Sequence, residues 1–143
     1  MQEIEQTLVI LKPECITNCI ISSVLKYFDD VGMRPIAMRQ LTATPEQMRI
    51  HYEDVILRVG ETIGADIISR MTRGPIIAIV YQGIDIINRI RTMIGSTDPK
   101  QALEGTIRER FGGSVQYNVI HASDSSSSAR KEIDLWFPEI IIK

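Results

Sequence analysis

The chain has 143 residues, of which 44% are hydrophobic and 24% charged, and its formal net charge at pH 7 is −2. This length suits one domain with its own hydrophobic core, and we expect residues 1–143 to form a single domain. The slightly negative charge argues against a general nucleic-acid-binding protein, and no apolar run is long enough to span a membrane. Because the first residues show no signal-peptide pattern, we expect a cytoplasmic protein.

In chain order, the first predicted element is a short strand over residues 7–11. A helix over residues 20–31 follows, because its apolar residues share one helical face, and Gly32 is a plausible stop. A second strand is expected over residues 34–41. Thr44 then starts a helix that runs to about Tyr52, since Gln47 completes a capping box and Pro45 suits the first helical position.

The second half of the chain continues the alternation of helices and strands. Residues 61–71 predict a helix, and the apolar residues 76–81 predict a strand buried on both faces. Isoleucines from Ile84 to Ile94 recur at helical spacing and stop at Gly95. A polar loop over residues 96–116 is long enough to be functional. A last strand over residues 115–120 and a helix over residues 125–137 complete a pattern compatible with a ferredoxin-like split βαβ core.

Histidine and cysteine are rare in this chain. Cys15 and Cys19 are the only cysteines, and the two histidines lie far from them in the sequence. Zinc sites normally take four such ligands in paired spacings, so we expect no metal site built by the protein, and two free thiols. His51 shows no signal beyond a surface position on a helix.

His121 ends a strand-like run just before a turn, a place where catalytic side chains often sit. Imidazole is nucleophilic near neutral pH, and the carboxylate of Glu132 in the following helix could bond its second ring nitrogen. Taken alone, His121 is better explained as a structural histidine at a strand end.

Several further residues change that balance. The first strand ends in Lys-Pro-Glu at residues 12–14, and residues 118–124 read Asn-Val-Ile-His-Ala-Ser-Asp. Together with Tyr52, Arg91, Thr97, Pro99 and residues 105–108, they make the chain resemble the nucleoside diphosphate kinase family over about residues 7–137. The resemblance implies an α/β (α+β) fold, a ferredoxin-like sandwich with a four-stranded antiparallel sheet and additional helices.

The resemblance also implies an activity. The enzyme would transfer the γ-phosphate of a nucleoside triphosphate, typically ATP, to a nucleoside diphosphate through a phosphohistidine on His121, by a ping-pong route. Glu132 matches the acid that bonds the histidine ring, and Ser123 matches a residue that bonds that carboxylate. Mg²⁺ would arrive on the nucleotide phosphates rather than in a protein cage.

The nucleotide would be bound mainly by cationic and hydroxyl side chains. In the family pattern, Lys12 lies near the transferred phosphate and the sugar 3′-hydroxyl, and Asn118 bonds the ribose. The remaining matches contact phosphates, and Arg58 falls where the alignment shifts. These residues are Tyr52, Arg58, Arg91, Thr97 and Arg108. Guanidinium suits this role because its donors are forked and it stays charged.

The chain departs from the family pattern at several positions. Ala122 replaces a glycine, Glu14 replaces an aspartate, and Glu109-Arg110 replace Gly-Asp. Residues 53–80 lack the phenylalanine on which the base usually stacks, and this stretch is about three residues longer than usual. Val59 or Ile63 would offer an aliphatic platform instead, so we expect broad base tolerance.

The assembly and one competing function stay open at this point. We expect a dimer-based homo-oligomer, a tetramer or a hexamer, with the apolar residues 140–142 packed on a neighbour. The usual hexamer is in doubt because residues 15–19 depart from the basic loop that supports it. The alternative is a non-enzymatic ferredoxin-like module that regulates or binds nucleic acid, and a phosphohistidine relay is a third reading. Evidence against the non-enzymatic module is that the family's site residues are intact, namely His121, Lys12, Tyr52, Arg91, Arg108 and Asn118.

Overall fold

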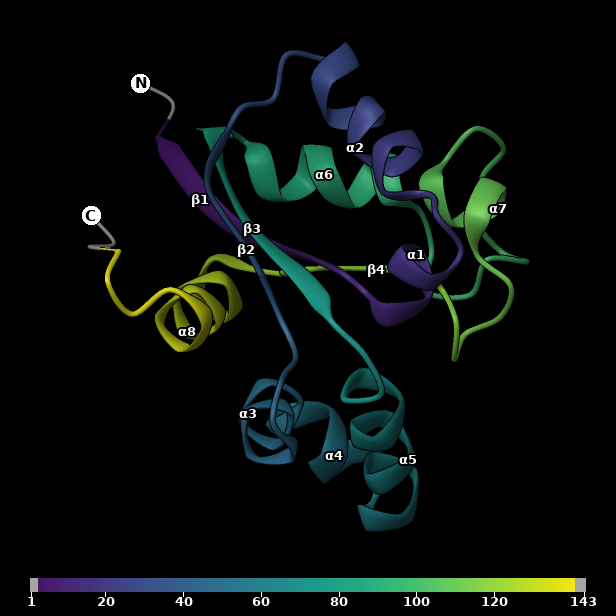
Figure 1. Ribbon diagram of the computed structural model, residues 1–143. Helices are drawn as coiled ribbons and strands as arrows, with labels where there is room; N and C mark the ends of the chain where they lie inside the picture. The colour runs from purple at the N-terminus through teal and green to yellow at the C-terminus, as the bar shows by residue number, and fades with distance from the viewer. Residues whose placement is uncertain (1–2, 141–143) are drawn as a thin grey trace.

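The computed structural model of the chain describes residues 3–140. At its centre lies a four-stranded antiparallel sheet in the order β2-β3-β1-β4 (Figure 1). The strands are β1 (Ile4–Leu11), β2 (Pro35–Leu41), β3 (Ile76–Ile84) and β4 (Ile120–Ala122). The two central strands carry the continuous apolar runs of the sequence, because both of their faces are covered.

Successive side chains of β1 and β3 point to opposite faces of the sheet, and each face carries its own hydrophobic cluster. Val9 and Leu11 pack with helices α2 (Ile21–Asp30) and α6 (Ile86–Ile94), which lie next to each other in Figure 1. Leu8 and Ile10 pack with helices α3 (Pro45–His51), α5 (Glu61–Met71) and α8 (Ser126–Trp136). Helix α8 covers the sheet itself, whereas α3 to α5 lie beyond one end of it (Figure 1).

The strand connections confirm the ferredoxin-like core. Strand β1 pairs with β3 on one side and β4 on the other, while β2 pairs with the outer side of β3. Strand β3 thus lies between β1 and β2, and β1 lies between β3 and β4, as a split βαβ arrangement requires. This topology brings the C-terminal end of β1 beside β4, so Lys12 and His121 come from neighbouring strands.

The predicted helix signals are confirmed at three places. The Thr44 hydroxyl accepts from the backbone N–H of Gln47, and the Gln47 side chain accepts from the N–H of Thr44. The Ser125 hydroxyl accepts from the N–H of Ser128 at the start of α8. Gly95 ends α6 with a φ of 88°, a conformation that favours glycine.

The predicted last strand was wrong in its limits. Residues 115–119 are not part of a strand, because Val119 adopts a φ of 66° and interrupts any extended run. Strand β4 is only three residues long, and His121 is its middle residue rather than its end. A branched side chain rarely takes this left-handed conformation, so the sequence carried no sign of it.

Three helices were not expected. Helix α4 (Glu53–Val59) follows α3 directly, and α1 (Pro13–Thr17) follows β1. Helix α7 (Ile107–Phe111) lies inside the polar stretch that was expected to be a loop. Helix α6 also starts later than predicted, because Ile84 still belongs to β3.

Several smaller expectations also meet the structure. Cys15 is buried and Cys19 is exposed, and both thiols are free. Among residues 3–140, no helix is both long and apolar enough to cross a membrane. Ile140 packs against the cluster around Leu8 and Ile10, while Ile141 and Ile142 lie outside the described residues.

Candidate active site

His121 is held by a hydrogen-bonded pair of side chains from two other positions. Its Nε2 lies 2.7 Å from Oε1 of Glu132 on α8, and the Ser123 hydroxyl donates to the same oxygen over 3.0 Å. Ser123 is fully buried, and its Oγ accepts from the backbone N–H of Leu8 on β1. The carboxylate that orients the histidine is therefore itself fixed to the central sheet.

This arrangement decides which ring nitrogen of His121 is free. An ionised carboxylate only accepts hydrogen bonds, so Nε2 of His121 carries the proton that Glu132 accepts. In the neutral ring the lone pair is then on Nδ1. The His121 side chain is 19% exposed and the Glu132 side chain 12%, so this nucleophilic ring is open to solvent only over a small part of its surface.

Lys12 and Asn118 are brought together from distant parts of the chain. The Lys12 ammonium donates to Oδ1 of Asn118 over 2.7 Å, and Nδ2 of Asn118 donates to the backbone carbonyl of Thr97 over 2.9 Å. Burial lowers the pKa of Lys12 to about 8, with a further contribution from the positive charges of Arg108 and Arg70, while the carboxylate of Glu14 opposes the shift. Lysine, asparagine and loop thus form one connected group.

Arg108 is the most enclosed of the candidate phosphate-binding residues. It is 7% exposed, and its guanidinium donates to the carbonyls of Gly95 and Ile120 over 3.0 and 2.7 Å. Its Nε is buried without a partner among the described residues. Burial, and then the positive charge of Arg91, lower its pKa to about 10. Two of its N–H groups therefore bond backbone carbonyls, and these bonds fix the orientation of the guanidinium.

The remaining candidates divide between the site and the surface. Tyr52 lies beside His121, with ring centroids 6.3 Å apart, and burial together with the charge of Glu132 raises the pKa of its hydroxyl. Arg91 is exposed on α6, close enough to lower the pKa of Arg108, and Thr97 is exposed in the following loop. Arg58 is exposed on α4, and no hydrogen bond joins its side chain to other residues of the described range.

His51 is the residue beside the candidate site that sequence reasoning placed wrongly. It does not lie on the surface: its ring packs edge-on against the ring of His121 with centroids 4.5 Å apart, and its Nδ1 accepts from the Trp136 indole N–H over 3.0 Å. Burial, and then the neighbouring His121 and Lys12, hold its pKa well below the usual range. A lone histidine on a helix gave no signal, because its partners come from α8 and β4.

His51, His121 and Glu132 offer ligand atoms within 4.8 Å of one another. Their hydrogen bonds use these atoms differently. The Trp136 N–H points at Nδ1 of His51, which leaves the proton of the neutral ring on Nε2, and Nε2 of His121 is protonated toward Glu132. A cation at either of these protonated nitrogens would have to displace the proton, and the Glu132 oxygen already accepts from His121 and Ser123, so these contacts orient the rings rather than leave an open set of metal ligands.

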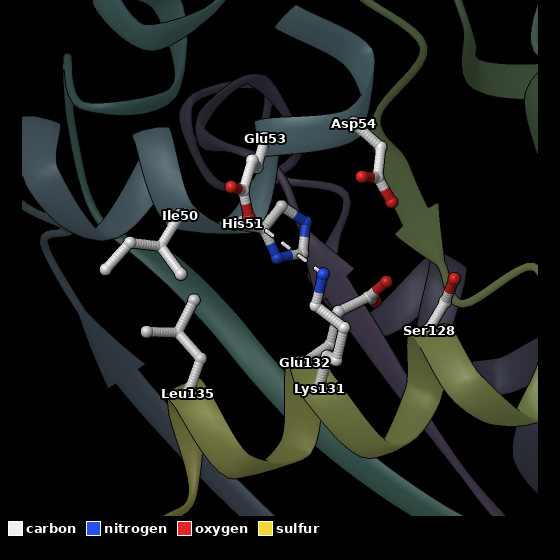
Figure 2. A pocket seen from close by; sticks show the side chains of 8 residues that line it. All are labelled: Ile50, His51, Glu53, Asp54, Ser128, Lys131, Glu132 and Leu135. Carbon is white, nitrogen blue, oxygen red and sulfur yellow. Dashed lines mark ion pairs between the residues drawn. The ribbon is translucent and has the colours of Figure 1, made fainter. Parts of the chain in front are cut away.

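A pocket opens between helices α3, α4 and α8, on the side of His51 and Glu132 (Figure 2). The Lys131 ammonium and a Glu53 carboxylate oxygen face each other across it at 4.0 Å. Of the candidate residues, only Glu132 lines this pocket. The pocket therefore lies beside His51 and Glu132, and none of the phosphate-binding candidates lines it.

Three departures from the family pattern are accommodated locally. The Glu14 carboxylate accepts from the backbone N–H of Val119 over 3.2 Å, so the longer acid still reaches the left-handed residue before β4. Ala122 lies in β4, and its φ is not among the positive values of the chain, so its methyl group causes no backbone strain. Glu109 accepts from the N–H of Gly105 over 3.1 Å and closes the turn before α7.

Comparison with known proteins places the chain in a family. Residues 5–142 match the family model of nucleoside diphosphate kinase. A nucleoside diphosphate kinase of Caldanaerobacter subterraneus subsp. tengcongensis is 38% identical over 138 residues, which cover 96% of this chain and 97% of that protein. Nucleoside diphosphate kinase B of Pongo abelii is 36% identical, with 99% of this chain and 92% of that protein covered.

Solved structures agree with the sequence relatives. The nucleoside diphosphate kinase of Aquifex aeolicus superposes with a TM-score of 0.90 at 33% identity, covering 97% of this chain and all of that one. A transition-state mimic of the Borrelia burgdorferi enzyme, with bound vanadate and ADP, superposes with a TM-score of 0.89 at 31% identity, covering 98% and 92%. The fold, the sequence and the oriented histidine lead to one conclusion: the chain belongs to the nucleoside diphosphate kinase family, whose phosphotransferase activity it shares.

Proposed function

We propose that His121 is the residue through which the nucleoside diphosphate kinase reaction passes. Its Nδ1 lone pair would attack the γ-phosphorus of a nucleoside triphosphate such as ATP, while the bond between that phosphorus and the β-γ bridging oxygen breaks. The diphosphate leaves and the enzyme carries phosphohistidine. A β-phosphate oxygen of the second nucleotide then attacks the same phosphorus, which restores the free ring.

The observation that carries this proposal is the contact between His121 and Glu132. It holds Nε2 as the protonated nitrogen and so leaves Nδ1 as the nucleophile. As the positive charge of the ring grows during attack, the Glu132 carboxylate stabilises it, and Ser123 keeps that carboxylate in place. Tyr52, beside His121, is proposed to contact the transferred phosphoryl group.

The phosphates are proposed to bind where the cationic candidates meet. Phosphoryl transfer depends mainly on positioning and on charge stabilisation, which Lys12, Arg91 and Arg108 can supply. Each terminal nitrogen of Arg108 donates one hydrogen bond to a backbone carbonyl, so the second N–H of each is left to bond a phosphate. Asn118 would bond the ribose and Thr97 a phosphate, and Arg58 is the least supported member of the set.

Mg²⁺ is proposed to enter on the nucleotide. The donor set agrees with this, because the carboxylates of Glu14 and Glu132 are already engaged with Val119 and His121. The metal would be held by phosphate oxygens and water, and would neutralise charge on the transferred phosphoryl group. The chain itself would orient the phosphates through Lys12 and the arginines.

The test is intact-protein mass after brief exposure to ATP and Mg²⁺, followed by GDP. One acid-labile phosphoryl group should appear and should leave as GTP when GDP is added. His121→Ala should remove both events while circular dichroism stays that of the wild type. Acid-labile phosphorylation that persists in the folded variant would contradict the assignment of His121, and a phosphoenzyme that ATP cannot form would favour a protein-fed relay.

The remaining sequence expectations are kept as proposals. Residues 1–143 are proposed to form one domain, which the single sheet and its two hydrophobic clusters support. A dimer-based homo-oligomer and a cytoplasmic location stay predictions. The non-enzymatic alternative loses its ground, because the family and its phosphotransferase activity are established by the relatives.

A further inference from the structure

Arg70, near the end of helix α5, is an arginine that neither the sequence motifs nor the reaction has yet used. Its side chain is only 13% exposed, in contrast to the exposed Arg58 on α4. Nε donates to the Asp66 carboxylate one turn earlier over 3.0 Å, and Asp66 is itself 62% exposed. The acid therefore orients the arginine without neutralising it fully, because a solvated carboxylate screens a charge only in part.

The rest of the Arg70 guanidinium reaches another part of the chain. One of its terminal nitrogens donates to the backbone carbonyl of Gln116, and the group lies over the Tyr117 ring at 5.7 Å from the ring centroid. Gln116 and Tyr117 directly precede Asn118, whose side chain bonds Lys12 and the Thr97 carbonyl. One side chain thus joins helix α5 to the segment that delivers Asn118.

This segment needs an outside support. Residues 112–119 form no helix or strand, and they end at the left-handed Val119. Backbone in such a conformation persists only where its surroundings hold it. Glu14 holds Val119 from one side, and Arg70 holds Gln116 from the other. The two charged contacts therefore bracket Asn118.

The charge of Arg70 also reaches the site. It contributes to lowering the pKa of Lys12, after burial and Arg108, and it opposes the rise in the pKa of Tyr52. The charged groups that face Lys12 are thus Glu14 from α1, Arg108 from α7 and Arg70 from α5. A cation this near to Lys12 adds to the field that attracts nucleotide phosphates.

We propose that Arg70 is a positioning residue of the nucleotide site, which fastens the Asn118 segment to helix α5 and adds positive charge beside Lys12. This role differs from that of Arg58, which the resemblance matched to a phosphate-binding arginine, because Arg70 acts through the Asn118 segment and Lys12. The inference rests on the proposed function, because it assigns nucleotide binding to Lys12 and Asn118.

The test compares four arginine variants, at Arg70, Arg73 and Arg58, in steady-state and single-turnover assays with ATP and GDP. Arg70→Ala should raise KM for the nucleotides about tenfold, the scale expected when a hydrogen bond to a charged group is lost, with a smaller change in kcat. Arg70→Lys should recover part of that loss, since it keeps the charge but not the forked donors. Arg73→Ala, an exposed arginine just past the same helix, is the matched control and should leave KM unchanged.

A pH profile separates positioning from mere stability. Without the Arg70 charge, the pKa of Lys12 should rise, so the alkaline limb of kcat/KM should move to higher pH in Arg70→Ala and return in Arg70→Lys. A lower melting temperature with an unmoved limb and unchanged KM would overturn the inference, as would a KM effect in Arg58→Ala that Arg70→Ala lacks. If the wild type formed no phosphoenzyme at all, the proposed function itself would fail, independently of Arg70.

Discussion

The two ends of the site are built in opposite ways. At the histidine end, hydrogen bonds join His121 to Glu132, Glu132 to Ser123 and Ser123 to β1, and the His121 and Glu132 side chains expose little surface to solvent. At the end formed by α4 and α5, Leu57 is 81% exposed and Ile63 53% exposed, and no aromatic side chain occurs between residues 53 and 80.

This difference indicates where the chain fixes geometry and where it leaves it free. Attack on phosphorus needs a nucleophile held in line, so misorientation of His121 by a small angle is costly. The nucleobase takes no part in the chemistry, and loose contact with it costs only binding. On the proposed function, we expect the rigid end to serve the rate of transfer and the open end to allow the base to vary.

The sharpest way to break the rigid end is Glu132→Gln. The amide has no charge, and it can present an N–H to His121 and so select the wrong tautomer. We expect the rate of phosphoenzyme formation to fall by about 10- to 100-fold, the scale typical of partners that orient a histidine ring. Asp134→Asn, an exposed acid on the same helix, is the control. A rate equal to that of the control would show that the Glu132 contact does not matter for transfer.

A second prediction concerns the pH dependence of the cationic group. Because the pKa of Lys12 is lowered to about 8, its charge is lost as the pH rises through that value. The charged form attracts phosphate, so kcat/KM should decline above about pH 8, by up to roughly tenfold per pH unit. Lys12→Arg keeps its charge at high pH and should flatten this limb, even if its overall activity is lower. A limb that stays in place in this variant would assign the titration to another group.

The smallest expected effect is at the open end. ADP, GDP, CDP and UDP should differ in kcat/KM by no more than about threefold, since the platform is at best aliphatic and stacking is weak. Ile63→Phe should lower KM for purine nucleotides by the equivalent of ~1 kcal/mol or less, the lower end of base–aromatic stacking. Ile63→Leu is the size-matched control. Strong base preference in the wild type would mean that another side chain reads the base.

Much of the fold followed from local patterns, and the exceptions have physical causes. The apolar runs of β1 and β3 and the capping box at Thr44 are visible in the sequence because neighbouring residues create them. Helix α4 was missed because it follows α3 after only Tyr52, with no break signal between them. The limits of β4 were missed because Val119, a residue typical of strands, takes a left-handed conformation here.

The site residues also divide into those that the sequence could predict and those that it could not. The bond between Lys12 and Asn118 joins residues 106 positions apart, so only the resemblance to a family could bring them together. Glu132 lies eleven residues from His121, on the helix after its strand, so its place in the sequence allowed the contact and the resemblance to a family assigned it. His51 and Arg70 could not be predicted, because both depend on contacts between helices that no local pattern encodes.

Trp136 is the only tryptophan of the chain, and its indole N–H is bonded to the histidine that packs on His121. The optical properties of an indole depend on the polarity and hydrogen bonding around it. The protein therefore carries an intrinsic fluorophore two rings away from Nδ1 of His121. On the proposed function, a charged phosphoryl group on His121 lies within the electrostatic reach of that fluorophore, and we expect tryptophan emission to report the state of His121 without any label.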